Sequence, residues 1–115
     1  MMLDDRLPAH IEVTGMIRAV EADGGFGMVI AKGERDAGTI LVICCRHGTQ
    51  SCAYERFPQL DGTRSWTRTK QQDPENPLEF SKFCDRRKQQ DSDLWIVELD
   101  HPEAVKFLNG PSSIG

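Results

Sequence analysis

Aromatic and arginine side chains lie close together near the middle of the chain and could form a contact surface. Tyr54, Glu55 and Arg56 share one predicted strand, and Arg64 and Trp66 follow on the next. Arginine and aromatic residues are the usual anchors of recognition surfaces. The structural alternative is that they form cross-strand pairs that hold a hairpin together. We predict this cluster as the surface that binds a partner.

A predicted helix further along the chain carries four bases near its end. Lys82, Arg86, Arg87 and Lys88 could contact the phosphates of a nucleic acid. The structural alternative is that bases in a last helical turn interact favourably with the helix dipole. The stem of Arg87 falls on the apolar face of this helix, and we add Arg87 to the predicted contact surface.

Carboxylates follow the same helix. Asp91 and Asp93 precede a predicted strand, on which Glu98 and Asp100 would share one face. A metal-dependent hydrolase requires such carboxylates, but no histidine lies at a diagnostic spacing. The structural alternative is that Asp93 ends a loop and Asp100 caps the last helix. The sequence therefore predicts no catalytic residue.

The chain has four cysteines, Cys44, Cys45, Cys52 and Cys84. Their spacing matches no zinc pattern. A loop over 47–50 would place Cys45 opposite Cys52, where a metal or redox site is conceivable. Buried cysteine more often acts as a small hydrophobic residue, and we predict neither a metal ion nor a cofactor.

The composition fits one small globular domain. The 115 residues are 38% hydrophobic and 28% charged, with a net charge of −4, which disfavours non-specific binding to nucleic acids. The N-terminus does not resemble a signal peptide, and the longest apolar run, 40–45, is too short to cross a bilayer. We expect a cytoplasmic protein with no membrane contact, a single domain over 1–115, an ordered core over 7–108 and a frayed tail at 111–115.

Hydrophobic periodicity predicts helices and strands in a definite order. The expected elements are a helix over 7–23, strands at 26–32, 39–46 and 51–57, a fourth strand after an Asp-Gly turn, a helix from 77, a strand over 94–99 and a short helix over 102–108. Short connections favour an antiparallel meander. The predicted fold class is α+β, with an antiparallel sheet of about five strands, two main helices packed on it and a short C-terminal helix.

Local signals predict how two of these helices begin or end. Gly24-Gly25 is typical of a helix C-terminus. Asn76 is the expected N-cap of the second helix, Pro77 its first residue and Glu79 the partner in a capping box.

The Asp-Gly pair at 61–62 predicts a two-residue hairpin turn. That register places Phe57 opposite Trp66 and Glu55 opposite Arg68, as an aromatic pair and an ion pair.

Several segments together carry a family resemblance. They are Ala37-Gly38-Thr39-Ile40-Leu41-Val42, Tyr54-Glu55-Arg56-Phe57-Pro58, Asp61-Gly62, Trp66 and the run over 91–100. In combination they resemble the uncharacterised alphaproteobacterial family known as domain of unknown function 1491, over residues 7–108. The resemblance implies a small bacterial cytosolic protein with no established activity, and it assigns no functional residue.

The expected function is that of a non-enzymatic module that contacts an unknown protein partner. Pro58 indicates an edge or a bulge in the hairpin, and an exposed hairpin edge could pair with a partner's strand or with a second copy as a homodimer. Nucleic-acid binding through the basic helix is the second reading, and a small metal-dependent hydrolase is the third.

Overall fold

The computed structural model describes residues 7–108, so the tail predicted at 111–115 lies outside the described residues. Its elements follow the predicted order closely. They are α1 (Ala9–Ala22), β1 (Phe26–Ala31), β2 (Ile40–Arg46), β3 (Thr49–Pro58), β4 (Arg64–Gln71), α2 (Pro77–Gln90), β5 (Trp95–Asp100) and the 3-10 turn η1 (Ala104–Phe107).

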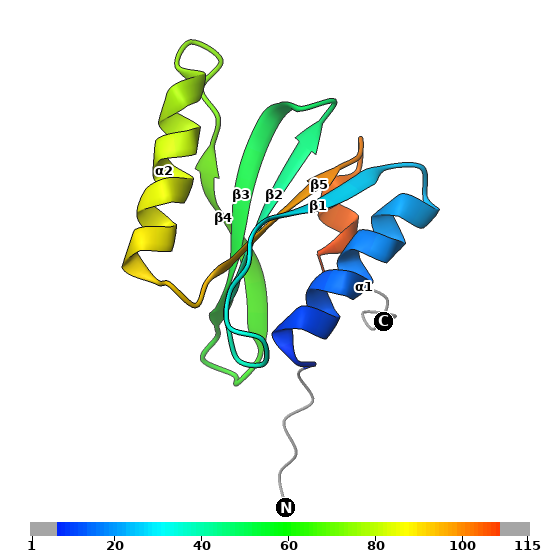
Figure 1. The fold of residues 1–115 in the computed structure, drawn as a ribbon, viewed down its shortest axis with the longest axis vertical. Coiled ribbons are helices and arrows are strands. Elements are labelled where there is room, and N and C mark those ends of the chain that lie inside the picture. Colours follow the sequence, from blue (N-terminus) through cyan, green and yellow to red (C-terminus); the bar gives the residue numbers. More distant parts are fainter. Residues whose placement is uncertain (1–6, 109–115) are drawn as a thin grey trace, which may run out of the picture.

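The sheet is mixed, so the antiparallel meander is wrong. Its strand order is β1-β5-β2-β3-β4, with β5 antiparallel to β1 and parallel to β2 (Figure 1). β5 is buried over most of its length on both faces, and a strand of this kind needs a neighbour on each side. The segment over 32–39 is long enough to pass the end of β5, which a hairpin turn is not.

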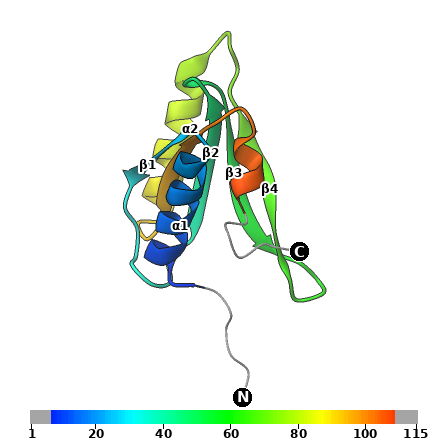
Figure 2. The same cartoon turned by 90° about the vertical axis from the view of Figure 1, so that its right-hand side faces the viewer.

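The two helices cover opposite faces of the sheet. One face packs α1 and η1 against Val42, Val97 and Leu99, and the other packs α2 against Leu41 and Ile96. In the view turned by 90°, α1 and η1 face the reader and α2 lies behind the strands (Figure 2). The α+β class is therefore confirmed. Within residues 7–108, no helix has the length and apolar character needed to cross a membrane.

The last predicted helix is wrong in type. Residues 104–107 form a 3-10 turn, closed by hydrogen bonds from Lys106 N–H to the Glu103 carbonyl and from Leu108 N–H to the Val105 carbonyl. Both bonds span three residues, which is the 3-10 pattern.

The helix ends agree with the sequence in part. Gly24 N–H and Gly25 N–H donate to the carbonyls of Glu21 and Val20, which confirms the predicted end of α1. Pro77 opens α2 as expected, but the capping box does not form, because the Asn76 side chain makes no capping hydrogen bond. The backbone carbonyl of Asn76 instead accepts a hydrogen bond from the N–H of Glu79, the residue predicted as its partner in the capping box.

Inside the closing pair of Gln59 and Thr63, the β3–β4 loop contains three residues, 60–62, rather than two. Gln59 N–H donates to the Thr63 carbonyl, and Gly62 N–H donates to the Gln59 carbonyl. Gly62 has a φ of 89°, and three-residue loops commonly end on a residue with this left-handed backbone. The Asp-Gly pair therefore marks the turn correctly, but it does not fix the loop length.

This difference moves the register by one residue. Arg56 lies opposite Trp66 and Glu55 lies opposite Thr67, so the predicted pairs of Phe57 with Trp66 and of Glu55 with Arg68 are wrong. A slip of one residue moves a side chain to the other face of the sheet. The indole therefore lies with the guanidinium of Arg56 and not with the phenyl ring.

The β2–β3 turn is also shorter than predicted. His47 and Gly48 form the turn, both with positive φ, and a bulge follows Cys44. Cys44 therefore lies opposite Cys52, and the predicted pairing of Cys45 with Cys52 is wrong.

The segment over 32–39 is fixed by contacts with β5. The Trp95 indole N–H donates to the Glu34 carbonyl over 2.7 Å, and Glu34 N–H donates to the Asp93 carbonyl. The same segment caps the start of α1, because the N–H groups of Ala9 and His10 donate to the carbonyls of residues 36 and 35. The N–H groups that a helix start leaves unsatisfied are thus paired by tertiary contact.

We expect Gly33→Ala to destabilise the fold by about 3 kcal/mol, because a β-carbon there would lie 2.1 Å from the Asp93 carbonyl oxygen. Gly62→Ala is the matched control. It meets no atom within 4 Å and carries only the strain of a positive φ, about 1 kcal/mol. Urea unfolding of both variants measures the difference, and equal losses would contradict the close approach of the segment to β5.

Candidate functional site

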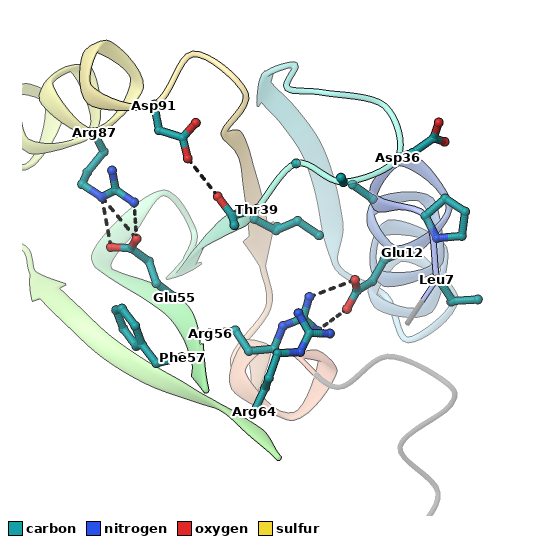
Figure 3. Close-up of a pocket in the computed structure, with 15 residues that line it drawn as sticks. Leu7, Glu12, Asp36, Thr39, Glu55, Arg56, Phe57, Arg64, Arg87 and Asp91 are labelled. Carbon is teal, nitrogen blue, oxygen red and sulfur yellow. Dashed lines mark hydrogen bonds and ion pairs between the residues drawn. The ribbon is translucent and has the colours of Figure 1, made fainter. Parts of the chain in front are cut away.

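A groove of about 570 Å³ opens at the end of the sheet where α1 begins and α2 ends. Its charged walls come from four elements and two connecting segments (Figure 3). The lining includes Glu12 of α1, Glu55, Arg56 and Phe57 of β3, Arg64 of β4 and Arg87 of α2.

On the α2 face, Glu55 forms an ion pair with Arg87. Nη2 of the arginine donates to Oε1 over 2.6 Å and Nε donates to the same oxygen over 3.2 Å. The Thr69 hydroxyl donates to Oε2 over 3.0 Å. Hydrogen bonding to Glu55 raises the pKa of Arg87 above its ordinary value. The Glu55 carboxylate is thus buried with its charge compensated.

On the α1 face, Arg56 pairs with Glu12. Nη2 donates to Oε1 over 3.0 Å and Nη1 donates to Oε2, which gives the two-pronged geometry that favours arginine. The guanidinium carbon also lies 4.7 Å from the centre of the Trp66 ring. Because neighbouring residues of a strand point to opposite faces, Glu55 and Arg56 connect β3 to both helices.

The predicted contact surface is divided by the sheet. Tyr54, Arg56 and Trp66 lie on the α1 face, where the two aromatic rings pack partly buried against the core. Glu55 and Arg87 lie on the α2 face. Of the six residues predicted for this surface, four line the groove: Glu55, Arg56, Arg64 and Arg87. The two aromatic residues do not.

Sequence reasoning missed Glu12. Glu12 precedes the buried Met16 by four residues, and residues with this spacing lie on the same face of a helix. Its carboxylate therefore lies on the buried face of α1. A charge on the apolar side of a helix was the available signal that a cation lies opposite. Thr39 and Asp91 share a hydrogen bond of 3.1 Å across the groove. The sequence marked Asp91 only as one of several carboxylates after the helix and Thr39 only as the start of a strand, and neither signal predicts this contact.

The basic residues of α2 are partly used within the fold. Arg87 is paired with Glu55, and the Lys88 ammonium donates to the carbonyls of Lys32, Ser92 and Leu94 over 2.7–2.8 Å. Lys82 and Arg86 remain exposed.

Of the carboxylates predicted on β5, Asp100 is held by backbone contacts. Asp100 accepts the N–H groups of His47 and Gly48 over 2.7 and 3.0 Å. Burial raises the pKa of Glu98, and Asp100 nearby adds to that increase. In the part of the chain that the structure describes, no three His, Cys, Asp or Glu side chains are grouped to hold a metal ion.

Burial controls the chemistry of the thiols. It raises the pKa of Cys44 and Cys45 to about 12 and that of Cys84 to about 11. A thiol is nucleophilic as the thiolate, so these three groups are inert at neutral pH.

We expect iodoacetamide at pH 8 to leave Cys44, Cys45 and Cys84 unmodified in the folded protein, because their thiols stay protonated and buried. Cys52 is partly exposed and serves as the internal control for reagent access. Tandem mass spectrometry locates the label. Rapid labelling of Cys44 or Cys45 before urea is added would contradict the assigned burial.

We expect Arg87→Met to destabilise the protein by about 2 kcal/mol, because it leaves the Glu55 carboxylate buried without its cation. Lys70→Met is the control. It removes the more exposed ion pair with Glu79, at 3.4 Å, and should cost less than about 1 kcal/mol. Thermal unfolding compares the variants, and equal costs would show that the buried pair has no special role.

Comparison with known proteins adds evidence on the family. A family model described as "Protein of unknown function (DUF1491)" matches residues 7–109. No curated protein matches the chain significantly.

Three solved structures share the fold. The crystal structure of a DUF1491 family protein from Caulobacter crescentus CB15 has 27% identity and a TM-score of 0.78, and the match covers 92% of this chain and 98% of that one. The NMR structure of a DUF1491 family protein from the same organism has 28% identity and a TM-score of 0.74, with 91% and 94% covered. The solution structure of protein Atu0922 from A. tumefaciens has 29% identity and a TM-score of 0.73, with 92% and 95% covered. Since the family model spans nearly the whole chain and these structures share its fold, the chain belongs to the DUF1491 family.

Proposed function

We propose that this protein is a non-enzymatic, cytosolic interaction module that binds a segment of another protein in the groove. One observation carries the proposal: arginine side chains already fixed by carboxylates line an open groove beside an exposed aromatic ring. Arg56 and Arg87 are held by Glu12 and Glu55, and Phe57 is 43% exposed at the same place. A side chain that is fixed before binding loses little conformational entropy on binding.

The charge balance supports a protein segment over a nucleic acid. Three guanidinium groups in the lining, those of Arg56, Arg64 and Arg87, are matched by four carboxylates. The carboxylates belong to Glu12, Asp36, Glu55 and Asp91. A polyanion gains little from such a surface, because its affinity comes mainly from unpaired bases. A peptide offers backbone carbonyl oxygens to the arginines and an apolar side chain to Phe57.

The state of the reactive groups supports the non-enzymatic part of the proposal. Burial holds three thiols protonated, and the Glu55 and Glu12 carboxylates are occupied by arginines. General-base or nucleophilic chemistry needs a group that is free to accept a proton or to attack.

Selection from a random peptide library displayed on phage tests the proposal. We expect bound peptides that share an apolar residue able to contact Phe57. Their affinity, measured by calorimetry, should fall by about tenfold or more in Arg64→Ala and in Phe57→Ser, because each removes an anchor at the groove.

Arg86→Ala is the control, since it removes an arginine on the exposed side of α2. It should leave the affinity unchanged, and circular dichroism confirms that each variant is folded. Unchanged affinity in both groove variants would refute the groove as the binding site.

A further inference from the structure

Glu98 of β5 carries a charge that the fold itself does not pair. It lies half-buried on the face of the sheet that packs against α2, two residues after Ile96. Burial raises the pKa of its carboxyl group, and the neighbouring Asp100 adds to that increase. Within residues 7–108, no side chain forms an ion pair or a hydrogen bond with Glu98. It differs in this respect from Glu12 and Glu55, each of which is paired with an arginine.

Apolar side chains surround this carboxylate on an open part of the sheet. Met28 of β1 and Ile43 of β2 lie beside Glu98 on the two neighbouring strands, and Phe26 lies opposite Asp100. Met28 is 53% exposed and Phe26 is 73% exposed. α2 lies toward the β4 end of the sheet, so this part of the face stays open (Figure 1).

The chemistry of this open part favours a guanidinium group as its ligand. A half-buried carboxylate gains most from a cation that is weakly hydrated and offers paired N–H donors, and arginine has both properties. Arginine also stacks on aromatic rings, which Phe26 supplies one residue pair along the strands. A metal ion is a poorer ligand here, since no three His, Cys, Asp or Glu side chains in the described range 7–108 are grouped to hold one.

We propose that the patch formed by Phe26, Met28, Glu98 and Asp100 binds a segment of a partner protein that presents an arginine between apolar side chains. Glu98 accepts the guanidinium N–H groups, because both oxygens of Asp100 already accept backbone N–H groups. The charge of Asp100 adds to the attraction. The apolar side chains of the segment cover Phe26 and Met28 and remove them from water.

This patch is separate from the groove. The groove lies beside Ile40, which is opposite the first residue of β5, whereas Glu98 and Asp100 lie at the other end of that strand. Binding at the patch is therefore independent of peptide binding in the groove.

Titration with a short peptide tests the proposal. The probe is acetyl-Leu-Ser-Arg-Ser-Leu-amide, whose leucine and arginine side chains share one face when the backbone is extended. NMR of protein labelled with carbon-13 at methionine methyl and glutamate carboxyl groups follows binding at Met28 and Glu98. Both signals should shift and saturate. A probe with citrulline in place of arginine has nearly the same shape without the charge, and it should bind about tenfold more weakly.

Glu98→Gln should also weaken binding of the arginine probe by about tenfold. Its thermal unfolding midpoint at pH 7 should rise, because the variant removes a half-buried charge that has no partner. Glu75→Gln is the matched control, since it removes an exposed carboxylate between β4 and α2 and should leave the affinity unchanged. Phe57→Ser alters the groove and should also bind the probe like the wild-type chain.

Four results would overturn the proposal. The first is that the Met28 and Glu98 signals do not shift with the probe at about 10 mM. The second is equal affinity for the citrulline probe. The third is an equal loss of affinity in either control variant, and the fourth is a lower unfolding midpoint for Glu98→Gln, which would show that the carboxylate stabilises the fold.

Discussion

Most of β5 is buried on both faces, with Glu98 and Asp100 half-buried toward its end, and the sheet places it between β1 and β2. The chain from β1 to β2 must therefore pass the end of β5, where Trp95 and Gly33 fix it. That segment in turn pairs the first N–H groups of α1 and forms one wall of the groove. The same placement leaves β1 as an uncharged outer edge. The groove thus depends on one buried strand.

A second constraint acts within β3. Glu55 and Arg56 are neighbours in sequence, and the strand geometry directs them to opposite faces. Each meets an oppositely charged residue of the helix on its face, Arg87 or Glu12. Removing one partner would leave the other charge poorly solvated, so both helices keep a fixed position relative to the strand. The same two ion pairs therefore stabilise the fold and fix the charged side chains that line the groove.

The errors of sequence reasoning have a common cause. The Asp-Gly pair located the β3–β4 turn, but Gly62 adopts a left-handed backbone at the end of a three-residue loop, and both predicted cross-strand pairs shift by one. The turn after β2 is also set by positive φ angles, those of His47 and Gly48, and it is shorter than predicted. As a result Cys52 lies opposite Cys44 and not opposite Cys45. Local signals indicate where the chain turns, whereas the register depends on backbone angles that several loop lengths satisfy.

The sequence by itself determined most of the local structure: the helix and strand segments, the end of α1, Pro77 at the start of α2 and the alternation that directs Trp95 and Ile96 to opposite faces. These features depend on residues close together in the chain. Only the tertiary structure decided that β5 enters between two earlier strands, that Glu12 meets Arg56 and that Glu55 meets Arg87. Such contacts join residues tens of positions apart, and their free energy arises when both layers pack, so no local pattern records them.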